Sequence, residues 1–145
     1  MVFNSIKRFV SDVQELTRKP KDNCSSVQKD INEALTGLSF DTVYGLNTCI
    51  RHVNKSRVIK TRIKNSAAKV GSSGGFRLIF IANPNNQVIT FLHVFSKQGR
   101  FRKDNISESE LKTILEELLE EAKSTALISA DFMTQKEMVT TNKNL

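Results

Sequence analysis

The sequence predicts a single α+β domain, and three observations lead to this class. The 145 residues are enough for one hydrophobic core of ordinary size. Apolar residues recur at helical spacing near both ends of the chain, in 9–16, 27–35 and 107–124. Between 58 and 97 the pattern changes to that of strands separated by turn residues. We therefore expect a compact antiparallel sheet with two helices before it and one after it.

The N-terminal region is predicted to fold as an α-hairpin. Residues 2–6 have the composition of a short first strand, and the helical stripe of 9–16 follows it up to the break KPKDN. A second helix over 27–35 ends before Gly37. The segment 38–57 is rich in β-branched and aromatic residues, and it fits either a strand or an extended loop.

Three strands are predicted in the middle of the chain. VIKTRIK alternates over 58–64, which places Lys60, Arg62 and Lys64 on one face. After a polar loop comes FRLIFIA, then the turn NPNN, and then the returning strand QVITFLHVFSK. Counting by twos along this last strand puts five side chains on one face: Ile89, Phe91, His93, Phe95 and Lys97.

The last helix has the clearest signals in the chain. Ser107 followed by Glu110 is a capping box, and a leucine-rich stripe continues to Ala122. Its outer face is acidic and should be solvated. Beyond 125 the periodicity is lost, so 126–145 is expected to be an extension, either a short strand or a frayed end, attached to a domain of residues 1–125.

Charge is distributed unevenly, and the basic part coincides with the predicted strands. Residues 51–103 contain twelve lysines and arginines and no aspartate or glutamate, although the whole chain has a net charge of only +7. Crowded like charges destabilise a fold, so an anionic ligand is expected to bind there. Charge alone leaves nucleic acid, a membrane surface and an acidic protein as candidates.

The sequence lacks the motifs that several other classes of function require. GSSGGFR is followed by a strand and has no GK[ST], so it reads as a strand connection and not as a nucleotide loop. Cys24 and Cys49 have neither zinc-site nor disulfide spacing, and we expect them to be buried or half-buried thiols. No metal or cofactor is expected. With no signal-peptide pattern and no long apolar run, we expect a cytoplasmic protein that does not enter a membrane.

His93 is the first candidate for acid–base chemistry within the basic stretch, because a neutral imidazole titrates near physiological pH. His52 ranks below it, since no motif surrounds it. His93 lies in TFLHVF among apolar residues, where a buried or half-buried histidine with only a structural role is the commoner case. No Ser/His/Asp or Cys/His arrangement can be drawn from the sequence.

The order KTRIK, GGFR, HVFSK and NISESE, with two helices before it, resembles the RelE/ParE toxin superfamily and most of all its RelE/HigB-type mRNA interferases. The resemblance covers about residues 58–120. It implies a RelE-like fold with a twisted antiparallel sheet. It also implies a toxin of a type II toxin–antitoxin system, a ribosome-dependent, metal-independent endoribonuclease that is neutralised by a cognate antitoxin protein.

In that family the substrate's 2′-hydroxyl attacks the adjacent phosphate, and cations stabilise the developing charge. Carried over to this sequence, the resemblance and the charge pattern select two sets of residues. The candidate catalytic residues are Lys60, Arg62, Arg77, His93 and Lys97, and the candidate RNA-binding residues are Lys64, Lys69, Arg100, Arg102 and Lys103.

Some members of the family place a tyrosine just before the last helix, whereas the only tyrosine here is Tyr44. The general base would then be His93 or a lysine. Two alternative functions are a ParE-like toxin that inhibits DNA gyrase without nuclease activity, and a basic nucleic-acid-binding module without enzymatic activity.

Overall fold

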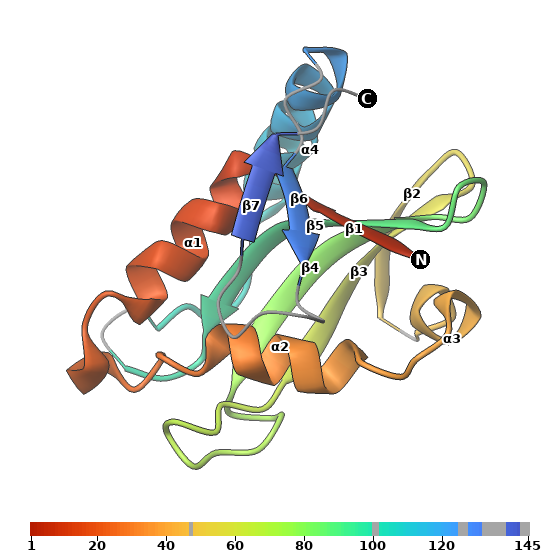
Figure 1. Ribbon diagram of the computed structural model, residues 1–145. Coiled ribbons are helices and arrows are strands. Elements are labelled where there is room, and N and C mark those ends of the chain that lie inside the picture. The colour runs from red at the N-terminus through yellow and green to blue at the C-terminus, as the bar shows by residue number, and fades with distance from the viewer. Residues whose placement is uncertain (47, 100–101, 125–127, 132–138, 143–145) are drawn as a thin grey trace.

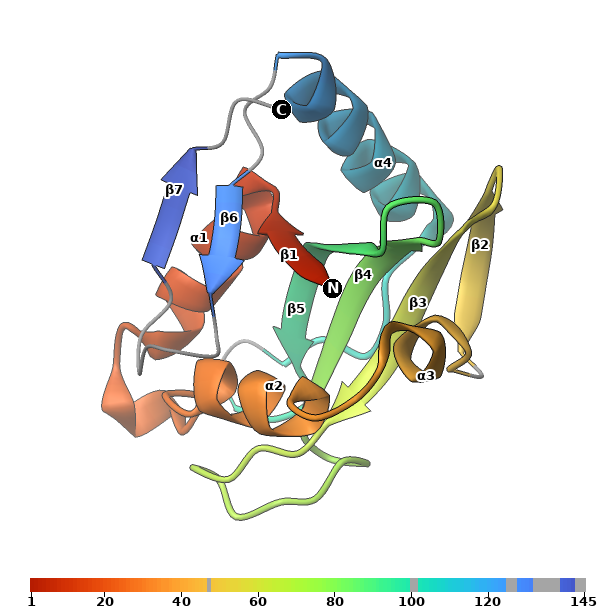
Figure 2. The same ribbon diagram turned by 45° about the vertical axis from the view of Figure 1, so that its right-hand side comes forward.

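The computed structural model describes the chain apart from residues 47, 100–101, 125–127, 132–138 and 143–145. It shows an α+β domain in which a central sheet has helices on both faces (Figures 1 and 2). In chain order the elements are β1 (Val2–Ser5), α1 (Lys7–Thr17), the 3₁₀ turn η1 (Pro20–Asp22), α2 (Val27–Leu35), α3 (Phe40–Tyr44), β2 (Cys49–Val53), β3 (Ser56–Ile63), β4 (Phe76–Asn83), β5 (Val88–Ser96), α4 (Glu108–Lys123), β6 (Ile128–Asp131) and β7 (Val139–Asn142).

The strands of the sheet lie in the order β2-β3-β4-β5-β1-β6-β7. The β2–β3, β3–β4 and β4–β5 pairs are antiparallel, but β1 runs parallel to β5. The prediction of an antiparallel sheet is therefore wrong at this pair, and the sheet is mixed. A hairpin turn sets the direction of neighbouring strands, whereas no turn links β1 to β5, so local sequence could not indicate their direction.

Apolar side chains form two cores, one on each face of the sheet. Helices α1 and α2 cover one face, where Phe9 and Ile31 meet Phe80 and Phe91. Figure 1 shows α2 running away from the lower end of α1 in a different direction, and not alongside it. Helix α4 covers part of the other face, where its residues Leu111 and Ile114 pack against the second core. The second core also contains Ile6, Val58, Ile79, Leu92 and Phe95.

A β-bulge in β5 changes which residues share a face. Ile79 of β4 lies opposite His93, but the next residue, Phe80, lies opposite Phe91, so Leu92 is an extra residue on β5. Phe91 consequently packs under α1 and α2, while His93 and Phe95 lie on the α4 face. The prediction that Ile89, Phe91, His93, Phe95 and Lys97 share one face is wrong for this reason.

The segments that the sequence left open are now assigned. Within 38–57 the structure describes α3 at 40–44 and β2 at 49–53, and β2 pairs with β3 at the sheet edge through a turn at Asn54. In the C-terminal extension, β6 pairs with β1 and β7 pairs with β6. The capping box at Ser107 and Glu110 is confirmed, as are a buried Cys24 and a half-buried Cys49.

Candidate functional site

Two rows of side chains cross β3, β4 and β5 on the face that α4 partly covers. In the first row, which we call the arginine row, strand register places Arg62 opposite Arg77, and Arg77 opposite Phe95. The next row, toward α4, is Lys60, Ile79 and His93. Residues directly opposite each other on antiparallel strands have Cα atoms about 5 Å apart, so the cations of the first row are close neighbours.

Arg77 is the least exposed cation of these rows, with 9% of its surface accessible. Its guanidinium donates hydrogen bonds to the carbonyls of Ser72 (3.0 Å), Ser73 (2.8 Å) and Phe76 (3.2 Å). Burial lowers the Arg77 pKa below its ordinary value, and the positive charge of Arg62 lowers it further. Among the described residues neither arginine has a carboxylate partner, which leaves an uncompensated positive pair.

Two further predicted catalytic cations, Lys60 of the second row and Lys97 just after β5, are held by the segment before α4. The Lys60 ammonium donates to Asn105 Oδ1 at 2.9 Å. The Lys97 ammonium donates to the Asp104 carbonyl at 2.8 Å and lies 3.9 Å from the Asp104 carboxylate. Each lysine therefore has a polar partner in this segment, and its ammonium keeps further donors for an anion.

The predicted RNA-binding residues are not all brought together. Strand β3 ends at Ile63, and Lys64 pairs with Glu33 of α2 at 2.8 Å, toward the opposite face from Lys60 and Arg62. The prediction that Lys64 shares their face is therefore wrong, because the strand alternation stops one residue earlier. Hydrogen bonding to Glu33 raises the Lys64 pKa.

The loop cations are distributed more widely. Lys69 is exposed, with φ = 58°, in the loop between β3 and β4. Arg102 lies 3.5 Å from the Asp104 carboxylate, and it is exposed. Arg100 lies outside the described residues.

His93 and Asp12 form a pair that the sequence analysis missed. Asp12, on α1, has its carboxylate 2.7 Å from His93 Nδ1 and accepts a hydrogen bond from the Val94 N–H at 3.2 Å. The two residues are 81 positions apart, and Asp12 belongs to a region where acids and bases balance. Only the packing of α1 against β5 brings this carboxylate to the basic stretch.

On its other side His93 contacts Lys103. The Lys103 ammonium lies 3.3 Å from His93 Nε2 and 5.4 Å from the centre of the Phe95 ring, and it also forms a short ion pair with Glu110 of α4. Hydrogen bonding to Lys103 lowers the pKa of the Glu110 carboxyl. Glu110 was predicted only as a helix cap, so its second contact is also new.

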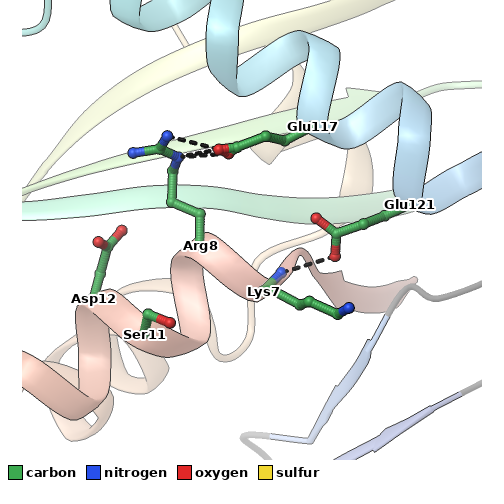
Figure 3. Close-up of a pocket in the computed structure, with 6 residues that line it drawn as sticks. All are labelled: Lys7, Arg8, Ser11, Asp12, Glu117 and Glu121. Carbon is green, nitrogen blue, oxygen red and sulfur yellow. Dashed lines mark hydrogen bonds and ion pairs between the residues drawn. The ribbon is translucent and has the colours of Figure 1, made fainter.

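A pocket of about 180 Å³ opens at this cluster and is lined by Asp12, Glu15, His93, Phe95 and Lys103, together with Leu16, Val94 and Ser96. A wider cleft of about 460 Å³ lies on the other side of Asp12, between α1 and α4. Figure 3 shows that Arg8 of α1 joins the two helices there through a bidentate ion pair with Glu117 of α4. Hydrogen bonding to Glu117 raises the Arg8 pKa. Glu121 of α4 also accepts a hydrogen bond from the Lys7 N–H at 2.9 Å, and the two contacts together hold α1 against α4.

Comparison of the chain with protein-family models, curated proteins and solved structures found no match. In the part of the chain that the structure describes, no three His, Cys, Asp or Glu side chains gather in a way that could hold a metal ion. Among those same residues, none of the helices is both long enough and apolar enough to span a bilayer.

Proposed function

We propose that the protein is an endoribonuclease that binds the phosphate backbone of mRNA on the sheet face of β3, β4 and β5. The observation that carries the proposal is the uncompensated Arg62–Arg77 pair beside the Asp12–His93–Lys103 cluster. Arginines bind phosphate through paired donors, and a histidine next to the same surface supplies a group for proton transfer.

The reaction that fits these side chains is attack of a ribose 2′-hydroxyl on the adjacent phosphate. It leaves a 2′,3′-cyclic phosphate and a 5′-hydroxyl. The transition state gathers negative charge on the phosphate oxygens, where Arg62 and Arg77 would act as fixed donors. RNA is favoured over DNA because this reaction needs the 2′-hydroxyl.

More specifically, the protein would be a cytoplasmic, ribosome-dependent mRNA interferase, the toxin of a toxin–antitoxin pair. It is supported by the places of the RelE-like motifs, since KTRIK, GGFR and HVFSK fall on three adjacent strands. The cognate antitoxin would cover the cationic face with an acidic segment. A gyrase inhibitor without nuclease activity is less well supported, because inhibition by binding alone gives no role to a paired histidine.

The experiment adds the purified protein to a reconstituted translation reaction and maps the mRNA ends. The proposal expects cleavage in the presence of ribosomes and little cleavage of the same mRNA without them. A parallel DNA-supercoiling assay with gyrase addresses the alternative. Intact mRNA together with inhibited gyrase would exclude the nuclease.

A further inference from the structure

Four side chains from four parts of the chain form one continuous line of hydrogen bonds. Asp12 of α1 contacts His93 of β5, His93 contacts Lys103 in the loop after β5, and Lys103 contacts Glu110 of α4. A carboxylate stands at each end, and the two groups between them can each give or take a proton.

The contacts around His93 fit one assignment of donors and acceptors. The Asp12 oxygen that faces His93 also accepts the Val94 N–H, so it acts as an acceptor. His93 Nδ1 must then carry the hydrogen and donate it to Asp12. Because Lys103 approaches the other nitrogen as an ammonium donor, His93 Nε2 carries a lone pair. In this assignment Nδ1 is the donor of the imidazole, and its acceptor nitrogen, Nε2, is directed at Lys103.

We infer that His93 and Lys103 are the general base and the general acid of the proposed RNA cleavage and that they restore each other after every turnover, with Asp12 as the positioning residue. This inference rests on the proposed function and supplies the proton transfer for which the sequence has no tyrosine at the family position. It also assigns Lys103, predicted only as an RNA contact, to the chemistry.

The steps balance without another reactant. The Lys103 ammonium first turns from His93 Nε2 to the 5′-oxygen of the bound phosphate, which frees the single lone pair of Nε2. His93 Nε2 then removes the proton of the 2′-hydroxyl as the 2′-oxygen forms a bond to phosphorus. The bond from phosphorus to the 5′-oxygen breaks, and that oxygen takes a proton from the Lys103 ammonium. The imidazolium and the neutral amine that remain are hydrogen-bonded neighbours, and transfer of one proton from Nε2 to Nζ returns both to the starting state. Asp12 stabilises the imidazolium while it exists.

The position of the pair agrees with this role. Lys103 lies over the ring of Phe95, and Phe95 lies opposite Arg77 in the arginine row. A phosphate bound by Arg62 and Arg77 would therefore lie one strand away from Lys103. The pocket of about 180 Å³ gives His93 and Lys103 an open side, and the other ionisable groups facing it are Asp12 and Glu15.

A purely structural role is the competing explanation, since the same contacts tie α1, β5 and α4 together. A substrate whose leaving group needs no proton distinguishes the catalytic role of Lys103 from a structural one. We would measure single-turnover cleavage of a ribosome-bound mRNA at its mapped site, once with the normal 5′-oxygen and once with sulfur in that bridging position. Sulfur leaves as a thiolate without protonation.

Two Lys103 variants are informative. Lys103→Arg keeps the positive charge beside Glu110, but a guanidinium does not release a proton near neutral pH. Lys103→Met removes the proton donor altogether. Both should cleave the oxygen substrate about 10²- to 10⁴-fold more slowly than wild type, the usual contribution of one acid–base group. Both should regain close to the wild-type rate on the sulfur substrate.

His93→Gln should be slow on both substrates, because it loses activation of the nucleophile and not of the leaving group. Asp12→Asn should shift the rising limb of the pH–rate profile, whereas Lys29→Glu on α2 should behave as wild type. Equal slowing of the Lys103 variants on both substrates, with wild type active, would overturn the assignment of Lys103 and leave the proposed function standing. A wild-type protein that cleaves neither substrate would overturn both.

Discussion

Replacing Asp12 by alanine should destabilise the fold, and the loss measures how much the hydrogen bonds from Asp12 of α1 to β5 contribute to stability. Asp12 accepts hydrogen bonds from His93 Nδ1 and from the Val94 N–H, and its side chain is 20% exposed while that of His93 is 7% exposed. A hydrogen bond to a charged acceptor contributes about 1.5–3 kcal/mol, and a buried donor left without a partner costs a similar amount. Allowing for water that reaches the exposed side of Asp12, we expect a loss of about 2–4 kcal/mol in the free energy of unfolding.

Urea denaturation followed by circular dichroism measures this loss, with Glu15→Ala as the matched control. Glu15 lies one turn along the same helix, and within the described residues its carboxylate has one ion-pair partner, the exposed Arg18. Such pairs contribute about 0–1 kcal/mol. If Asp12→Ala cost no more than Glu15→Ala, the bridge would not stabilise the fold, and the geometry on which the histidine assignment rests would be wrong.

Three further predictions concern other parts of the structure. Hydrogen bonding to Lys103 holds the folded-state pKa of Glu110 below its usual value near 4.5. The ion pair therefore stabilises the fold above about pH 4.5, and this stabilisation is lost as the pH falls through the lower folded-state pKa. Urea titrations at a series of pH values should show that Glu110→Gln weakens this acid dependence. Gly75→Ala should cost about 1–3 kcal/mol in thermal or urea unfolding, because an added Cβ would overlap the backbone carbonyl of Ile63, whereas Gly71→Ala meets nothing within 4 Å and should be nearly neutral. Lys64→Ala should leave the RNA cleavage rate almost unchanged, because its side chain is directed at α2; a loss as large as that of an arginine-row variant would contradict this placement.

Local signals in the sequence were sufficient to predict the elements that begin or end at a recognisable helix cap or turn. The capping box at Ser107 and Glu110 located α4, and the NPNN turn located the hairpin of β4 and β5. The alternation of β3 correctly placed Lys60 and Arg62 on one face. These features depend on residues close together in the chain, which is why they can be read without the tertiary structure.

Features that depend on distant contacts could not be predicted in this way. The bulge at Leu92 moves His93 to the α4 face, although TFLHVF gives no sign of an inserted residue. The direction of β1 and the approach of Asp12 to His93 both follow from the packing of α1 against the sheet. The cations were therefore found from composition, but the carboxylates that organise His93 and Lys103 were not.

If RNA is cleaved at the arginine row, reversing a charge there must slow cleavage more than the same reversal on the opposite face. Arg62→Glu reverses an exposed charge in that row, while Lys29→Glu makes the same change on α2, which covers the opposite face. Both proteins would be added to ribosome-bound mRNA, and the cleavage rate and end groups measured. We predict wild-type rates for Lys29→Glu, with cyclic-phosphate and 5′-hydroxyl ends, and a loss of about 10²-fold or more for Arg62→Glu, as when a transition-state donor is removed. Equal rates for the two variants would contradict the account.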